Sequence, residues 1–288
     1  MDYHSPASFT EASALAAATT GVTRFLAGGT DVLVQLRSDM VTPDLLIDIK
    51  KIDGVSDITR TPDGGWTLGV AVTGAEMSEH GDLGRDWPGI VEAMDLIGST
   101  QVQGRATLVG NLCNGSPAAD SVPAMIAAGV SVTVTGPNGE RVVPVEDIPT
   151  GPGKTSLARG EVISAVNIPP RGQNAGDAYL RFIPRTEMDI AVVGCGVSLR
   201  LDGDTLTEAR VSLGAVAPTV LLVEDCAKAI IGTTLDDAAL EALATAASAA
   251  CNPIDDKRGT IAFRTDVAGV LARRAAKIAY ARAKGEQA

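Results

Sequence analysis

Hydrophobic residues are spaced differently in the two parts of the chain, and the spacing predicts different elements. Up to residue 168, short apolar runs alternate with turn-forming residues, which is typical of buried strands. Segments rich in alanine, or with apolar residues at helical spacing, predict helices between these strands. The predicted strands are 22–27, 45–49, 66–70, 131–135, 141–143 and 161–168, and the predicted helices are 9–18, 31–37, 74–79, 90–97 and 122–128.

A run of turn formers, Pro-Pro-Arg-Gly-Gln-Asn-Ala-Gly at 169–176, predicts a domain boundary. Beyond it the predicted strands come first and Ala-rich helices follow, an order that indicates an α+β domain. These strands are 179–182, 190–201 and 210–216, and these helices are 223–231, 235–250 and 266–284.

Two adjacent glycines join the first predicted strand to the helix after it. In Ala27-Gly28-Gly29-Thr30-Asp31 the glycines allow a tight turn, and its amides can point at an anion. Thr30 adds a hydroxyl that can cap the helix. The spacing is neither the nicotinamide fingerprint nor a P-loop, so this motif alone predicts an ordinary strand-to-helix turn.

A second loop of small and amide residues changes that interpretation. Residues 107–120, Thr-Leu-Val-Gly-Asn-Leu-Cys-Asn-Gly-Ser-Pro-Ala-Ala-Asp, again precede an apolar helix. Two such loops in one chain predict one extended, phosphate-bearing ligand held between them.

With both loops in view, the chain resembles the flavin-binding medium subunit of the molybdenum hydroxylases, the family of xanthine dehydrogenase and aerobic carbon monoxide dehydrogenase. The matching segments keep their order and separation and span most of the chain. They are Ala27-Gly28-Gly29-Thr30-Asp31, Thr107 to Asn111, Ser116-Pro117-Ala118-Ala119-Asp120, and Pro184-Arg185-Thr186-Glu187-Met188-Asp189-Ile190-Ala191.

The resemblance implies an α+β fold in two domains. Residues 1–173 would form a PCMH-type FAD-binding domain of two α/β subdomains, about 1–55 and 56–173. Residues 177–286 would form a smaller α+β C-terminal domain of the carbon monoxide dehydrogenase flavoprotein type, with an antiparallel sheet plus helices.

By the same resemblance, FAD lies extended between the two loops. The first loop would hold the pyrophosphate with main-chain amides, and the second would clamp it with side chains of Thr107 and Asn111. The implied cofactor-binding residues are Leu26, Ala27, Gly28, Gly29, Thr30, Asp31, Val32, Ile97, Thr107, Gly110, Asn111, Asp120, Ile163, Tyr179 and Arg181.

Five of these residues have more particular implied roles. Asp120 corresponds to an acid that holds a flavin-side or ribityl hydroxyl, although a helix N-cap is a local alternative. Ile163 matches a position whose backbone contacts the isoalloxazine ring. Arg181 stands where relatives often have a lysine near the flavin carbonyl edge. Ile97 matches a position that can carry an aromatic residue packed on the flavin, and Tyr179 is the nearby aromatic that could replace it.

One position departs from the family pattern. Relatives usually have Gly-Gly-Asn in the second loop, whereas this chain has Val109-Gly110-Asn111. Valine disfavours positive φ and is branched at Cβ. Either the backbone there is extended and Val109 points away, or FAD is held less tightly.

Composition limits the partners. The net charge of −11 argues against nucleic acid or an anionic membrane surface. No apolar run reaches membrane-spanning length, and no signal peptide is apparent, so a cytoplasmic protein is expected. The four cysteines are widely separated, which predicts buried free thiols and neither an iron–sulfur nor a zinc site on this chain.

No catalytic set is recognisable either. His4 and His80 are predicted to have surface or packing roles, and Arg185 and Glu187 a structural ion pair. The chain is therefore expected to be an electron-transfer subunit. A large molybdenum-binding subunit would carry the molybdenum–pterin cofactor, and a small iron–sulfur subunit the 2Fe-2S clusters, in a dimer of heterotrimers. The alternatives are a free-standing flavin oxidoreductase of the same fold and an assembly or binding protein that has lost FAD.

Overall fold

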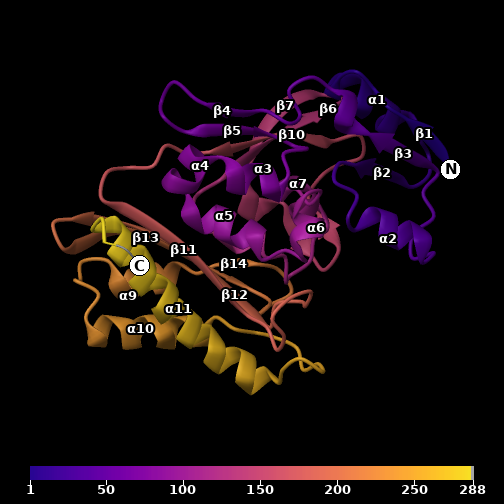
Figure 1. The fold of residues 1–288 in the computed structure, drawn as a ribbon. Helices are drawn as coiled ribbons and strands as arrows, with labels where there is room; N and C mark the ends of the chain where they lie inside the picture. The colour runs from indigo at the N-terminus through magenta and orange to yellow at the C-terminus, as the bar shows by residue number, and fades with distance from the viewer. Residues whose placement is uncertain (287–288) are drawn as a thin grey trace.

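A computed structural model describes residues 1–286, and its first unit is a small parallel sheet (Figure 1). The strand order is β1-β3-β2, and β3 pairs in parallel with both neighbours. Parallel strands need crossover connections, which the helices supply, so the predicted β-α-β unit is confirmed. The elements are β1 (Asp2–His4), α1 (Phe9–Ala18), β2 (Thr23–Leu26), α2 (Val32–Arg37), β3 (Leu45–Asp48) and the 3-10 helix η1 (Ile49–Lys51).

The second unit is built on a five-stranded antiparallel sheet in the order β4-β5-β10-β6-β7. Figure 1 shows its helices between this sheet and the C-terminal unit. The main strands are β4 (Ile58–Arg60), β5 (Trp66–Gly69), β6 (Ser131–Gly136), β7 (Gly139–Pro144) and β10 (Val162–Ile168). The helices are α3 (Gly74–Glu79), α4 (Gly81–Asp86), α5 (Pro88–Asp95), α6 (Thr100–Gln103), α7 (Leu108–Cys113) and α8 (Ser121–Ala127). The 3-10 helix η2 (Val145–Asp147) and the short pair β8 (Pro149–Gly151) and β9 (Lys154–Thr155) complete the unit.

The C-terminal unit is an antiparallel sheet, β11-β12-β13-β14, covered by three helices. Figure 1 shows α11 lying along the sheet. Strands preceding helices confirm the predicted α+β arrangement. The elements are β11 (Ala175–Phe182), β12 (Val193–Asp202), β13 (Thr205–Gly214), β14 (Leu221–Leu222), α9 (Glu224–Ile230), α10 (Asp237–Ala249) and α11 (Ile261–Ala283).

The hydrophobic interior is divided into two clusters, and β11 contributes to both. Ala178 belongs to the cluster under the C-terminal helices, whereas its neighbour Tyr179 belongs to the cluster of the first two units. Successive side chains of a strand point to opposite faces, so β11 carries one face into each cluster.

Helix α8 lies directly on the C-terminal sheet, and glycines make this approach possible. A Cβ atom on Gly196 would stand 2.4 Å from the carbonyl oxygen of Pro123, and one on Gly214 would stand 2.8 Å from the Pro123 ring. Arg210 of β13 then donates to the carbonyl of Ile126 and to Glu146. The main chain of α8 in the second unit thus packs directly against the main chain of the C-terminal sheet.

Most predicted elements are present, some with shifted ends. The hairpin between β6 and β7 is confirmed, and α1 begins where Ser8 accepts a hydrogen bond from the Glu11 amide. The last helix begins at Ile261, earlier than expected, because Thr260 caps it. The second segment was predicted as a loop over 107–120, and this is wrong in part: residues 108–113 form α7.

Candidate functional site

The first glycine turn contacts the residues that lead into the second loop, through main-chain atoms. Gly29 has a φ of +78°, a conformation that favours glycine. A Cβ atom on Gly28 would stand 1.8 Å from the carbonyl oxygen of Arg105 and 3.4 Å from the Cα atom of Ala106. The first loop and the residues just before the second loop, far apart along the chain, therefore meet in the fold.

Helix α2 follows this turn and is exposed on its outer face. Leu33 and Val34 are 50% and 60% exposed, and no residue of the helix is fully buried. Thr30 does not cap the helix: Asp31 occupies the N-cap position, and its side chain bonds to Gln35 instead of a helix amide. Ala27 and Val32 are half-buried beside the turn, and Leu26 is buried at its start.

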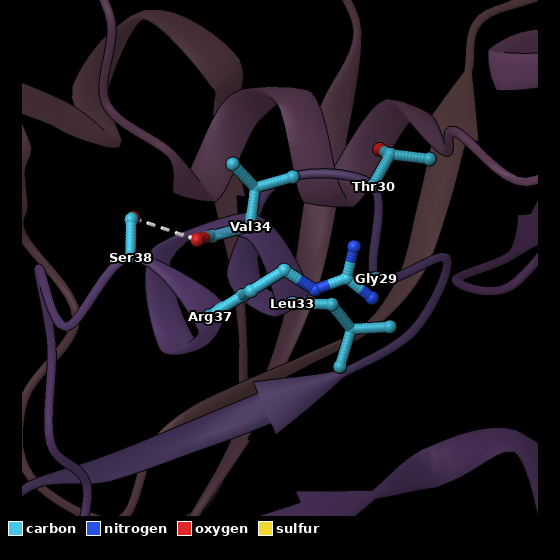
Figure 2. A pocket seen from close by; sticks show the side chains of 6 residues that line it. All are labelled: Gly29, Thr30, Leu33, Val34, Arg37 and Ser38. Atoms are coloured by element: carbon cyan, nitrogen blue, oxygen red, sulfur yellow. Dashed lines mark hydrogen bonds between the residues drawn. The ribbon is translucent and has the colours of Figure 1, made fainter.

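A cavity of about 370 Å³ lies along α2 (Figure 2). In Figure 2 the Arg37 side chain extends along the helix toward the Gly29 turn. The cavity residues that follow the turn were not among the cofactor-binding residues predicted from the sequence. They are spaced i, i+4 along the helix, and this spacing could have identified them. The lining residues are Gly29, Thr30, Leu33, Val34, Arg37 and Ser38.

The second loop is organised by Thr107, which caps α7. The Thr107 hydroxyl accepts from the Gly110 amide at 3.0 Å. The side-chain oxygen of Asn111 accepts from the Ser121 amide at 3.1 Å and from its hydroxyl at 2.7 Å. These bonds fix α7 against the start of α8, and they leave the Asn111 side-chain NH₂ group as its free donor within residues 1–286.

Val109 lies in α7, so of the first alternative the extended backbone is wrong, whereas the side chain does point into the interior. Its side chain is 9% exposed and packs in the first hydrophobic cluster. A helical backbone accepts valine without positive φ, and the branched side chain contributes to the interior. The departure from the family pattern is therefore compensated by packing.

Three of the predicted residues form one buried polar cluster between the units, defined as Asp120, Tyr179 and Arg181. The Tyr179 hydroxyl donates to Oδ1 of Asp120 at 2.9 Å, and Nη1 of Arg181 donates to Oδ2 at 2.7 Å. Burial raises the pKa of the Asp120 carboxyl to about 6, against the lowering effects of the Arg181 charge and the Tyr179 bond. Burial also raises the pKa of Tyr179 well above its usual value, so the phenol stays a donor.

This cluster corrects two expectations about single residues. Asp120 precedes α8 but makes no side-chain capping bond, because both of its oxygens are bound to residues of β11. Tyr179 is 2% exposed and presents its hydroxyl to Asp120, so it is not free to pack on a ligand in place of Ile97. Ile97 is half-buried after α5, and Ile163 is buried in β10, where only its main chain can face a ligand.

Other polar residues proved to have local roles. Arg185 pairs with Asp189 rather than with Glu187, so the predicted pair had the wrong partner. His80 accepts from the Leu83 amide and packs edge-on against Trp66, a structural role of the predicted kind. Cys195 and Cys226 are buried as predicted, but Cys113 is exposed and Cys251 is half-buried.

Neither a metal-binding cluster nor a membrane span is found in the part of the chain that the structure describes. No group of three or more His, Cys, Asp or Glu residues gathers there as a metal site. No helix there combines the length and the hydropathy needed to cross a bilayer.

Comparison with known families matches almost the whole chain. Residues 1–171 match the FAD binding domain in molybdopterin dehydrogenase, and residues 178–279 match the CO dehydrogenase flavoprotein C-terminal domain.

Individual proteins match over nearly their full length. The carbon monoxide dehydrogenase medium chain of Afipia carboxidovorans is 34% identical over 289 residues, covering 99% of this chain and 98% of that one. The xanthine dehydrogenase FAD-binding subunit of Escherichia coli O157:H7 is 30% identical over 264 residues, covering 91% and 90%. A solved carbon monoxide dehydrogenase from Hydrogenophaga pseudoflava superimposes with a TM-score of 0.93 at 32% identity, covering 98% of both chains. Since the family models, the relatives and the fold all agree, the chain belongs to the family of FAD-binding medium subunits of the molybdenum hydroxylases.

Proposed function

We propose that the chain is the electron-transfer subunit of a molybdenum hydroxylase complex. It would pass electrons from iron–sulfur clusters of a small partner subunit to an external acceptor, while a large molybdenum-binding subunit hydroxylates the substrate. The observation that carries the proposal is the contact of Gly28 with the Arg105 carbonyl, just before the second loop. In that loop, Asn111 accepts a hydrogen bond from Ser121, the residue after Asp120.

The residues present fit FAD. Gly28 and Gly29 place no side chain over the turn, and Gly29 is left-handed, which suits phosphates bound by amides without a cation. Nε of Arg181 is buried and has no acceptor among residues 1–286, so the guanidinium retains hydrogen-bonding capacity. Bound FAD would supply reversible redox chemistry, a role in which the protein contributes binding and electrostatics.

Within that role, the chain's own residues would bind and orient the cofactor. The amides of Gly28, Gly29 and Thr30 would receive the pyrophosphate, and Thr107, Gly110 and Asn111 would close the second side. The cation of Arg181 would stabilise negative charge near the flavin carbonyl edge. Residues 1–173 would hold FAD, and residues 177–286 would complete the site through β11.

The same proposal extends to the assembly. The chain would join its large and small partners in a dimer of heterotrimers in the cytoplasm, without nucleic acid or membrane insertion. In support of this, the matching relatives include a carbon monoxide dehydrogenase medium chain and a xanthine dehydrogenase FAD-binding subunit, names that imply larger enzymes.

Purification from the source organism tests this assembly. We expect FAD, a large subunit and a small iron–sulfur subunit to co-purify with the chain, and acid precipitation to release the flavin into the supernatant. A chain that purifies alone and without flavin would favour the assembly protein that has lost FAD.

The isolated chain provides the second test. Its FAD should be reduced by dithionite and reoxidised, whereas it should hydroxylate no purine, aldehyde or aromatic heterocycle. Turnover of any of these by the chain alone would favour the free-standing flavin oxidoreductase and contradict the proposal.

A further inference from the structure

Asp120 belongs to the second unit, yet both hydrogen-bond donors to its carboxylate come from the C-terminal sheet. Tyr179 and Arg181 are alternate residues of β11 and reach the two carboxylate oxygens separately. Asp120 is 8% exposed, and the Arg181 side chain is 4% exposed. Because this site is shielded from water, each hydrogen bond strongly affects which protonation state its partners adopt.

The position of the Tyr179 hydroxyl is enforced by the neighbouring strand. Gly194 of β12 pairs with Arg181, and a Cβ atom on it would stand 2.7 Å from the phenolic oxygen. Only glycine there leaves space for the hydroxyl to reach Asp120. The main-chain amide of Tyr179 is also held, because it donates to Glu92 of α5 at 3.3 Å.

The net charge of the cluster changes when Asp120 gains or loses its proton. With Asp120 ionised, the Asp120–Arg181 pair is neutral; with Asp120 protonated, the charge of Arg181 is uncompensated. The titratable and charged groups facing Asp120 are Tyr179 and Arg181 of β11, and Cys195 of β12 faces Tyr179. Both Tyr179 and Cys195 have pKa values raised by burial, so they stay neutral while Asp120 titrates.

The cluster is also connected to the second loop. Asn111 accepts two hydrogen bonds from Ser121, the residue that follows Asp120. A change of charge at Asp120 therefore takes place beside the residues that would clamp the cofactor.

On these observations, and resting on the proposed function, we propose that Tyr179 is a positioning residue for the cofactor site. Its hydroxyl keeps Asp120 ionised against Arg181, and it thereby sets the pH at which the affinity for FAD changes.

The direction of the effect follows from charge. FAD is a dianion, so a positive cluster at the flavin end of its site also favours binding, and the cluster is positive when Asp120 is protonated. Affinity should therefore rise as the pH falls through the pKa of Asp120, about 6. Removing the Tyr179 hydroxyl takes a hydrogen bond away from the ionised form, so the pKa rises and the inflection moves to higher pH.

FAD titrated into the full-length apo protein from pH 5 to pH 8, alone and together with its co-purifying subunits, tests this. The wild-type Kd should fall roughly tenfold toward low pH. In Tyr179→Phe the inflection should move up by about one pH unit. In Asp120→Asn the inflection should disappear. Arg210→Gln is the matched control, because it loosens the opposite end of α8 and should leave the inflection in place.

Each result either supports or contradicts the inference. An unshifted inflection in Tyr179→Phe contradicts the inference, and if that variant does not fold, an inflection that persists in Asp120→Asn contradicts it instead. A shift equal to that of Arg210→Gln would mean that general loosening of the units is the cause. Wild-type protein that takes up no FAD, alone or assembled, would contradict the proposed function itself.

Discussion

The carbonyl oxygen of Arg105 occupies the space that a Cβ atom of residue 28 would need, with only 1.8 Å between the two positions. Gly28 is thus required by the protein's own main chain as well as by any phosphate that lies over the turn. Contact between the first loop and the residues that lead into the second loop depends on that absent side chain.

Gly28→Ala should therefore both destabilise the protein and weaken FAD binding. Forcing the loops apart should cost about 1–3 kcal/mol of unfolding free energy, the usual range for overpacking. Gly81→Ala is the control, because its Cβ meets nothing within 4 Å. Thermal melting of the apo proteins and FAD titration measure the two effects, and a Gly28→Ala protein that behaves like the control would show that the loops do not touch.

Gly29→Ala should act through the backbone instead. Holding alanine at a φ of +78° costs about 1–2 kcal/mol, and its Cβ would stand 2.9 Å from a methyl carbon of Leu26. We expect a lower melting temperature with the Gly28–Arg105 contact intact. A melting temperature equal to that of the wild type would mean that the turn is not left-handed.

Val109→Gly tests the residue that departs from the family pattern. Losing a buried side chain from α7 and gaining backbone freedom should lower the free energy of unfolding by roughly 2–4 kcal/mol. FAD affinity should not change, because the valine packs in the interior. Val109→Ala separates the loss of the side chain from the flexibility of glycine, and tighter FAD binding by the glycine variant would show that Val109 faces the ligand.

Asp177 should make stability depend on pH in an unusual direction. Burial raises its pKa to about 6, although Arg171 and the Gly89 amide favour the ionised form. The folded protein then binds this proton more tightly than the unfolded chain, so the stabilisation is full below about pH 4 and is lost as the pH rises toward 6. Urea unfolding of wild type and Asp177→Asn across this range should show a smaller slope in the variant, where only Asp120 still contributes in this direction.

Asp63 provides the opposite case for the same experiment. The Thr61 hydroxyl lowers its pKa, so its stabilisation is present at neutral pH and is lost on acidification. Asp63→Asn should leave the Asp177 slope unchanged, and an equal slope in all three proteins would mean that Asp177 does not titrate in this range.

Arg264 should contribute more to the free energy of unfolding than any surface arginine. Its side chain is 4% exposed and donates to the Val192 carbonyl and to Asp256, both at 2.7 Å. Arg264→Met leaves these acceptors without their donor and should cost about 3–5 kcal/mol. Arg273→Met breaks an exposed pair with Glu241 and should cost about 0–1 kcal/mol, so equal losses in chemical denaturation would contradict the assignment.

Sequence patterns predicted the local elements well because strands and helices depend on neighbouring residues. The α7 helix was missed because its glycine and asparagine favour turns, whereas the capping by Thr107 stabilises the helix. The partners of Asp120 could not be derived, because Tyr179 and Arg181 are 59 and 61 residues away and are brought near only by sheet packing. Family resemblance identified these residues without showing that they bind one another.

The seating of α8 on Gly196 and Gly214 has a consequence for how this protein can be divided. A fragment ending near residue 173 would carry α8 without its sheet, and the remaining fragment would carry a glycine-lined groove open to water. The first fragment would also lack Tyr179, which packs in its hydrophobic cluster. Expression of either half alone should give an aggregating product, and exchange of C-terminal halves between relatives should succeed only when α8 is exchanged with them.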